Sequence, residues 1–177
     1  MKTLILPGYS EHNRDWAEEV AKNLMPSAKS NITKSGKKRS QIIVHVWDHW
    51  SKGGSLNINS EVEKILVEVG KEKVNFIAKS VGTKVLMSVV PRIKEQINKV
   101  ILCGIPIDPV GYAKVLKQIG YDNLVIFQNS QDPFMPYKAI KLYIKAVDKN
   151  IKVIEKPRFD HSYPYYYDFK LFLKGKS

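Results

Sequence analysis

A serine between two small residues is the strongest chemical feature of the sequence. Residues 78–82 are Ala-Lys-Ser-Val-Gly, and they join an apolar run at 74–78 to a helical pattern at 83–90. A strand-to-helix turn with small residues two positions before and after a serine lets the two backbones approach closely and holds the hydroxyl out at the end of a sheet. In that setting Ser80 would be a nucleophile for hydrolysis. The other interpretation is an ordinary helix start with Ser80 as its N-cap.

A nucleophilic serine needs a base that takes its proton and a carboxylate that orients the base. Asp132 lies four residues after the apolar run that ends at Gln128, and His161 lies seven residues after the run that ends at Ile154. We expect Asp132 to be the carboxylate and His161 the base. Asp108 is a rival carboxylate, although its loop also suits the N-cap of a following helix.

The other histidines fit a catalytic base less well. His45 lies within a predicted strand, His49 follows that strand, and His12 stands in the loop after the first strand. We expect His12 to lie close enough to the site to contact substrate. Lys79, beside the serine, has two interpretations: a surface lysine, or a cation near the pocket that favours acidic or polar substrates.

Acyl transfer also needs fixed N–H donors for the oxyanion that forms during the reaction. The backbone N–H of Val81 is one candidate, because it follows the serine at the amino end of a predicted helix. The N–H of Tyr9 is the second, because Gly8 lets the loop at 7–10 turn close to a substrate. A Pro-Gly pair also occurs in ordinary turns, so this loop alone does not identify the function.

These residues are set among short β-branched runs that alternate with amphipathic stretches. The apolar periodicity predicts strands at 3–6, 41–47, 74–78, 99–103, 124–128 and 151–154, and helices at 14–24, 59–69, 83–90, 112–119, 137–147 and 163–173. This alternation is typical of an α/β three-layer sandwich, with a mostly parallel sheet covered on both faces. Chemistry in such sheets collects outside the carboxyl ends of the strands, where the candidate residues fall. We expect a single domain over residues 1–177, without a substantial lid between the fourth strand and the last helix.

Charge and composition narrow the function classes. The net charge is +12, but 25 of the 29 basic residues are lysines scattered along the chain, with one cluster in a basic stretch at 27–40 that we expect to be a flexible loop. Without arginine forks or aromatics beside that charge, we expect no specific nucleic-acid partner. Cys103 lies in an apolar run, which favours a buried thiol in a reducing compartment.

The sequence also bears on the localisation of the protein and on its need for a metal or another cofactor. No apolar run approaches the twenty residues that a membrane span needs, so we expect a cytoplasmic protein without a membrane partner. The loop at 7–10 is not a phosphate-binding glycine loop. The histidines, the cysteine and the carboxylates show no metal-site spacing. We therefore expect neither a metal nor another cofactor.

Together these motifs resemble those of the α/β-hydrolase fold. The motifs are Leu-Pro-Gly-Tyr at 6–9, the serine turn at 78–82, Asp-Pro-Phe-Met-Pro at 132–136 and Asp-His-Ser-Tyr at 160–163. The order serine, aspartate, histidine is the one that this fold uses. The size and the expected absence of a cap are similar to those of small bacterial hydrolases related to retinoblastoma-binding protein nine. An alanine at 78 replaces the more usual glycine, and Pro7-Gly8 replaces the usual His-Gly; neither departure removes a catalytic group.

The resemblance implies an architecture and a function. The strands, counted along the chain, would lie in the order 2-1-3-4-5-6. Ser80 would be the nucleophile, His161 the base and Asp132 its orienting carboxylate, in a serine hydrolase of carboxylesterase type that acts on a small-molecule ester or a related acyl bond. The alternative is a non-catalytic binding protein of the same fold that holds an acidic partner on its basic surface. Binding alone does not require all three of these residues.

Overall fold

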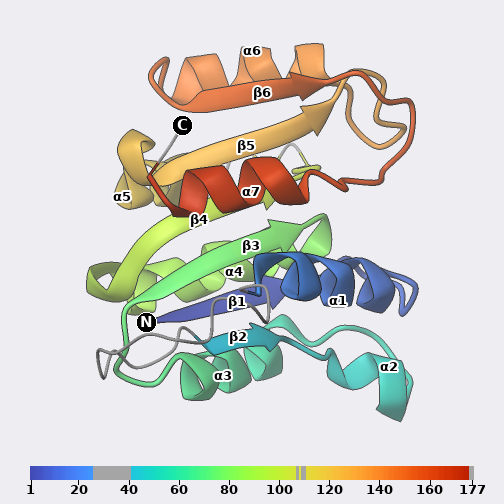
Figure 1. Ribbon diagram of the computed structural model, residues 1–177, viewed down its shortest axis with the longest axis vertical. Coiled ribbons are helices and arrows are strands. Elements are labelled where there is room, and N and C mark those ends of the chain that lie inside the picture. Colours follow the sequence, from blue (N-terminus) through green and yellow to red (C-terminus); the bar gives the residue numbers. More distant parts are fainter. Residues whose placement is uncertain (26–40, 107, 109–110, 176–177) are drawn as a thin grey trace.

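The protein is built around one six-stranded sheet in which every neighbouring pair of strands is parallel. The computed structural model describes residues 1–25, 41–106, 108 and 111–175. The basic stretch at 27–40 lies outside the described residues. The strands have the order β2-β1-β3-β4-β5-β6 (Figure 1), which confirms the order expected from the sequence. Their bounds are β1 Lys2–Leu6, β2 Gln41–Val44, β3 Val74–Lys79, β4 Ile97–Cys103, β5 Leu124–Asn129 and β6 Lys152–Lys156.

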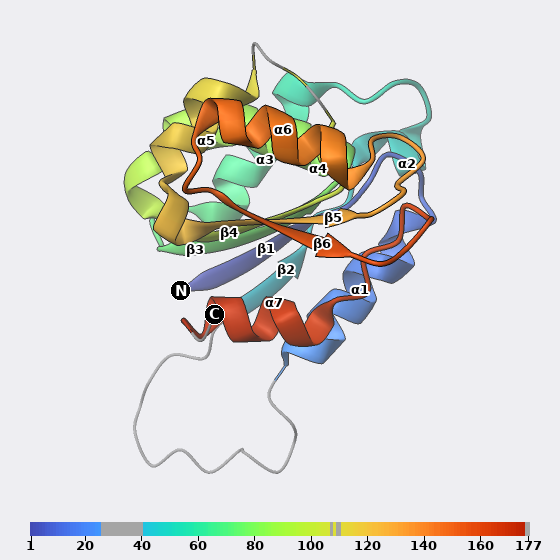
Figure 2. The ribbon, with the colours of Figure 1, turned by 90° about the horizontal axis from the view of Figure 1, so that it is seen from above.

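Helices cover both faces of the sheet, so the molecule has three layers. They are α1 Asn13–Leu24, α2 Asp48–Lys52, α3 Ile58–Val69, α4 Val81–Val89, α5 Tyr112–Ile119, α6 Tyr137–Val147 and α7 Tyr166–Leu173. Figure 2 shows α3, α4, α5 and α6 on one face and α1 with α7 on the other. Among the described residues none forms a separate lid between β4 and α7, because α5 and α6 both pack into the core on the sheet.

Alternating strand residues build a separate core on each face. Leu4 and Leu6 of β1 pack with α3 to α6, whereas Ile5 between them packs with α1 and α7. This follows from the two-residue period of a strand, which sends successive side chains to opposite faces. Both faces of the central strands are therefore apolar, as parallel sheets require. Cys103 ends β4 on the α1 and α7 face and is fully buried, as expected.

The second strand is shorter than the predicted 41–47. It ends at Val44, although the N–H of His45 still donates to the carbonyl of Ile5 at 3.0 Å. The His45 ring turns toward α3, where Nε2 lies 3.0 Å from a Glu61 carboxylate oxygen and Nδ1 lies 2.9 Å from Glu68. A short helix, α2, then begins at Asp48, where the sequence analysis predicted no helix. The N–H of Asp48 donates to the buried Glu61 carboxylate, which fixes the start of that helix.

The last helix also begins later than predicted, at Tyr166 instead of residue 163. Two causes are visible. Pro164 disfavours a helical conformation for the residue before it. The Tyr163 side chain is fully buried, with its hydroxyl bonded inside the molecule, so this residue belongs to the loop that follows β6.

Parallel strands bring all their carboxyl ends to one edge. In Figure 1 the arrowheads of β3, β5 and β6 point to the same side, where the loops after β5 and β6 run close together. Ser80 follows β3, Asp132 follows β5 and His161 follows β6, so the fold alone carries three residues from distant parts of the chain to one edge. Within the described ranges, no helix is both long and apolar enough to cross a membrane.

Candidate active site

Ser80 occupies a strained turn between β3 and α4. Its backbone has φ 53° and ψ −122°, and it is the one non-glycine residue in the described part of the chain with a positive φ. Such a conformation costs about 1–3 kcal/mol, so the surrounding structure must enforce it. The Ser80 N–H donates to the carbonyl of Cys103 at 2.9 Å, and the Thr83 hydroxyl donates to the Ser80 carbonyl at 2.6 Å. The serine is therefore held in a sharp strand-to-helix turn and is more than an ordinary N-cap.

Gly82 explains why the turn needs small residues. A Cβ atom at this position would lie 2.4 Å from the carbonyl oxygen of Leu6 and 2.6 Å from that of Pro7. Both atoms belong to the backbone, so neither can rotate away. The close approach also places the loop after β1 against the amino end of α4.

Replacing Gly82 by alanine is expected to lower the free energy of unfolding by about 1–3 kcal/mol, the usual cost of forcing extra atoms into a packed site. The added methyl group must displace the backbone of Leu6 and Pro7, and with it the loop after β1. Urea unfolding of Gly82→Ala beside the wild type measures this effect. Equal unfolding midpoints and slopes would contradict this account of the turn.

Asp132 and His161 form a hydrogen-bonded pair. Nδ1 of His161 lies 2.6 Å from Oδ2 of Asp132, whose side chain is fully buried. The other carboxylate oxygen accepts the backbone N–H groups of Phe134 at 2.9 Å and Met135 at 3.3 Å. The hydroxyl of Tyr163 donates to Oδ2 at 2.5 Å. Burial raises the pKa of the Asp132 carboxyl, but the hydrogen bonds from His161 and Tyr163 outweigh it, so the pKa lies below its usual range.

Several residues hold His161 in place. Asn129, at the end of β5, donates from its side-chain amide to the carbonyls of Asp160 at 2.7 Å and Ser162 at 2.8 Å, which clamps the loop on both sides of the histidine. Gly104 has φ +60°, and a Cβ there would lie 2.6 Å from Cε1 of His161. The position therefore requires glycine both for its backbone and for its space.

Sequence reasoning missed Asn129, Gly104 and Tyr163. Asn129 is a fully buried polar residue at the end of a strand, and Tyr163 stands two residues after the histidine. Their roles depend on hydrogen bonds to distant parts of the chain, which these sequence features do not indicate.

The pair and the serine face one cavity. It has a volume of about 280 Å³ and lies at the carboxyl edge of the sheet, where Nε2 of His161 is buried without a hydrogen-bond partner among the described atoms. The lining residues are Ser80, Val81, Lys84, Gly104, Ile105, Pro106, Asp132, Phe134, Met135 and His161. A buried imidazole nitrogen without a partner, on the wall of a cavity that a strained serine also lines, is what a base and its nucleophile need before a substrate binds.

The loop after β1 is fixed by three aromatic side chains. Its Gly8 carbonyl accepts from Nε1 of Trp47 at 3.0 Å, and its Tyr9 carbonyl accepts from Nε1 of Trp50 at 2.7 Å and from Nε2 of His49 at 2.8 Å. The Tyr9 ring is half exposed and stacks on His49 with centroids 4.6 Å apart. With both carbonyls held, the peptide units of this loop keep one orientation. The proposed role of the Tyr9 N–H depends on that orientation.

The remaining sequence candidates lie outside the cavity lining. His12 is exposed in the turn that leads into α1. Asp108, the rival carboxylate, accepts the N–H of Gly111 at 3.0 Å near the start of α5, whereas Nδ1 of His161 is bonded to Asp132.

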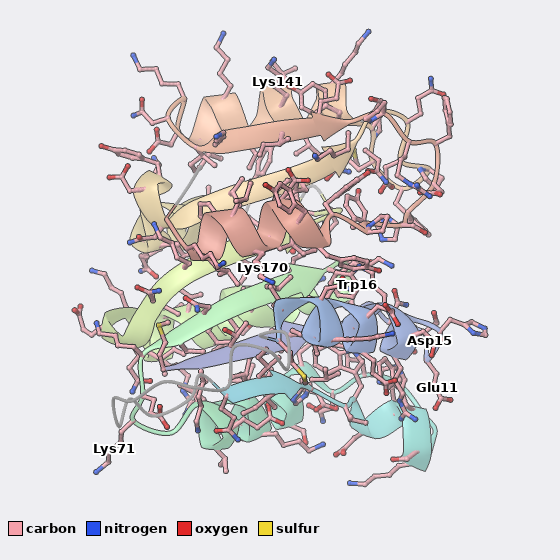
Figure 3. All side chains as sticks on the ribbon, in the orientation of Figure 1. Glu11, Asp15, Trp16, Lys71, Lys141 and Lys170 are labelled. Atoms are coloured by element: carbon pink, nitrogen blue, oxygen red, sulfur yellow. The ribbon has the colours of Figure 1, made fainter. Side chains whose placement is uncertain are left out.

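Of the two interpretations of Lys79, the one that makes it a surface lysine is wrong. It is only 7% exposed, and its ammonium donates to Oδ1 of Asn13 at 2.7 Å and lies 5.4 Å from the centre of the Trp16 ring. Figure 3 labels Trp16 on α1, so Lys79 points to the layer formed by α1 and α7. Burial lowers the pKa of Lys79, while the charges of Asp132 and Asp160 oppose this effect. The cause is the two-residue period of a strand: Lys79 is the last residue of β3, so its side chain points to the same face of the sheet as that of Ile77.

Among the described residues, no group of three or more histidine, cysteine and carboxylate side chains is arranged to hold a metal ion.

Tyr163→Phe is expected to lower the free energy of unfolding at about pH 7 by about 1.5–3 kcal/mol, the usual value of a hydrogen bond to a charged group. Because the pKa of Asp132 is lowered in the folded protein, its ionised form stabilises the fold above the ordinary carboxyl pKa, and this contribution is lost as the pH falls through the folded-state pKa. Without the Tyr163 hydroxyl that folded-state pKa rises, so the loss begins at higher pH. The difference in the free energy of unfolding between Tyr163→Phe and the wild type should become smaller at acidic pH.

Urea unfolding across a pH series tests this expectation. Tyr166→Phe is the matched control, because Tyr166 is a partly buried tyrosine whose ring packs on Phe169. An equal loss in both variants, or a difference that does not change with pH, would contradict the role given to the Tyr163 hydroxyl.

Comparisons with known proteins support the fold. No protein-family model matches the sequence, and no curated protein matches it. Solved structures match over nearly the whole chain. XC6422 from Xanthomonas campestris, described as an α/β serine hydrolase without a lid, is 11% identical with a TM-score of 0.64, and the match covers 98% of this chain and 79% of that one.

Two further solved structures give the same result. A variant of SOBER1 from Arabidopsis thaliana is 10% identical with a TM-score of 0.66, and 99% of each chain is covered. Est1E from Butyrivibrio proteoclasticus, determined with ferulic acid bound, is 16% identical with a TM-score of 0.63, and the match covers 99% of this chain and 86% of that one. At these identities the likeness concerns the fold alone.

Proposed function

Because the chain has the α/β-hydrolase fold, we propose that it is a serine hydrolase that cleaves a carboxylic ester or a related acyl bond through an acyl-enzyme. One observation carries the proposal. The pair of Asp132 and His161, with 2.6 Å between Oδ2 and Nδ1, leaves the imidazole Nε2 unpartnered in the cavity that the strained Ser80 also lines.

The proposed mechanism begins with proton transfer from the serine. The Asp132 carboxylate accepts a hydrogen bond from the Nδ1–H of His161, so the neutral imidazole keeps its proton on Nδ1 and presents a lone pair at Nε2. His161 takes the proton of the Ser80 hydroxyl as the oxygen attacks the carbonyl carbon of the substrate. The N–H groups of Tyr9 and Val81 stabilise the resulting oxyanion.

The second half of the reaction returns every group to its starting state. His161 gives the proton to the leaving oxygen, the carbon–oxygen bond to the alcohol breaks, and the acyl group stays on Ser80. Water then attacks the acyl-enzyme while His161 takes its proton, and the same proton returns to Ser80 as the acid leaves. No electrons are exchanged with a redox partner, so the proposed reaction needs no cofactor.

A screen of esters with acyl chains of increasing length tests the proposal. Wild-type protein should hydrolyse at least one chain length, and Ser80→Ala should lower that activity on the order of 10⁶-fold. Hydrolysis that is equal in both proteins would contradict the assignment of Ser80. A complete lack of turnover by wild-type protein would favour the alternative, in which the basic surface of a chain with net charge +12 binds an acidic partner.

A further inference from the structure

The cavity wall carries a cation that sequence reasoning did not single out. Lys84 lies near the start of α4, four residues after Ser80, and lines the same cavity. The cavity volume is only about 280 Å³, so both side chains border one small space. A substrate held at Ser80 would therefore lie within reach of the Lys84 ammonium.

Among the described residues, no carboxylate pairs with this cation. Asp132 is the one carboxylate among the lining residues, and its oxygens are occupied by His161, Tyr163 and two backbone N–H groups. Within the ranges that the structure describes, Lys84 takes part in no ion pair. It is exposed at the cavity, so its charge is open to a ligand.

The rest of the wall is mostly apolar. Ile105 and Pro106, in the loop after β4, face the cavity with Phe134 and Met135 from the loop after β5. The Phe134 ring is 75% exposed and meets the ring of His161 edge to face, with centroids 4.7 Å apart. The cavity volume of about 280 Å³ lies just below the range of roughly 300–1,000 Å³ that holds drug-sized ligands, so it suits a short chain.

The proposed mechanism decides which part of the substrate meets Lys84. His161 must give a proton to the leaving oxygen, so the alcohol lies toward His161 and Phe134. The acyl chain then extends toward α4 and the loop after β4, where Val81, Lys84 and Ile105 form the wall. An acyl group on this path passes apolar side chains and ends at a cation.

We propose that the substrate is a half-ester of a short dicarboxylic acid, whose free carboxylate binds the Lys84 ammonium while its acyl carbonyl is attacked by Ser80. This inference rests on the proposed function and names the substrate class of the same site. It also replaces the expectation of an acid-selecting role for Lys79, since Lys84 is the lysine that lines the cavity.

Two probes of similar length isolate the effect of the carboxylate. The 4-methylumbelliferyl half-ester of glutaric acid is anionic, and 4-methylumbelliferyl hexanoate is neutral. The ratio of their kcat/KM values, each corrected for the rate measured with Ser80→Ala, cancels differences in enzyme concentration. The ratio should favour the half-ester in wild-type protein and should fall as salt is added, because salt screens exposed charges.

Lys84→Met is expected to lower this ratio about tenfold, since it keeps the length of the side chain but removes a charge-assisted hydrogen bond. Lys84→Arg should retain most of the preference. Lys71→Met is the matched control, because Lys71 is exposed before β3 at the opposite edge of the sheet (Figure 3), and this change should leave the ratio as in wild type.

The outcomes separate this inference from the function on which it rests. A Ser80-dependent hydrolysis of both probes with the same ratio in wild type and Lys84→Met would overturn the inference and leave the proposed function standing. A neutral ester hydrolysed equally by wild type and Ser80→Ala would overturn both. An equal fall of the ratio in Lys71→Met would show a general charge effect and would also overturn the assignment of Lys84.

Discussion

Replacing His161 by alanine is expected to lower kcat on the order of 10⁶-fold, the scale seen when the base of a serine protease triad is removed. The reason is that His161 is the one histidine, in the described part of the chain, that lines the cavity with Ser80, and its buried Nε2 has no hydrogen-bond partner there. The hydrolysis rate of the best ester from the acyl-length screen measures the effect.

Chemical rescue sharpens this test. His161→Ala leaves a space bounded by Gly104 and the Phe134 ring, into which free imidazole fits as the missing base. Added imidazole should restore part of the activity of His161→Ala and none of the activity of Ser80→Ala. An alanine variant that keeps more than about a tenth of wild-type activity would contradict the role of His161.

Asp132→Asn is expected to lower kcat on the order of 10⁴-fold, because an asparagine at this position favours the wrong tautomer of the histidine. The amide nitrogen would donate where the carboxylate accepted, and Nε2 would then carry the proton and lose its role as a base. Asp108→Asn is the matched control. Its carboxylate accepts from Gly111 near the start of α5, and its replacement should change the rate by less than about tenfold.

The pH dependence of the same variant gives a second readout. A buried carboxylate that is ionised supports the imidazolium formed during the reaction, so its removal should lower the rate across the whole accessible pH range and not only in acid. Equal losses in Asp132→Asn and Asp108→Asn would contradict the assignment of Asp132 as the orienting carboxylate.

The sequence predicted the positions of the three candidate residues because parallel sheets obey simple rules. Alternating strands and helices place every strand's carboxyl end at one edge, so residues after β3, β5 and β6 had to lie near that edge. The turn at Ser80 could be predicted from its small neighbours. The structure adds the reason, which is that the backbone of Leu6 and Pro7 leaves no room for a side chain at position 82.

The supporting residues could not be predicted, because their roles arise from contacts between distant segments. Tyr163 bonds a carboxylate 31 residues earlier, and Trp50 bonds a carbonyl 41 residues earlier. No pattern among neighbouring residues in the sequence indicates either of these contacts. Lys79 and Lys84 also could not be told apart from the sequence, because both are lysines close to the serine. Strand alternation places Lys79 on the face of the sheet that α1 covers, where it is buried, whereas Lys84 lies on α4 and lines the cavity.

Labelling with a fluorophosphonate probe tests the central claim most directly, because this reagent forms a covalent adduct only with an activated nucleophile. Wild-type protein should gain the mass of one adduct, and peptide mass spectrometry should place it on Ser80. Ser80→Ala should gain none, and His161→Ala should react far more slowly. An adduct on another residue, or equal labelling of wild type and Ser80→Ala, would contradict the claim that Ser80 is the nucleophile.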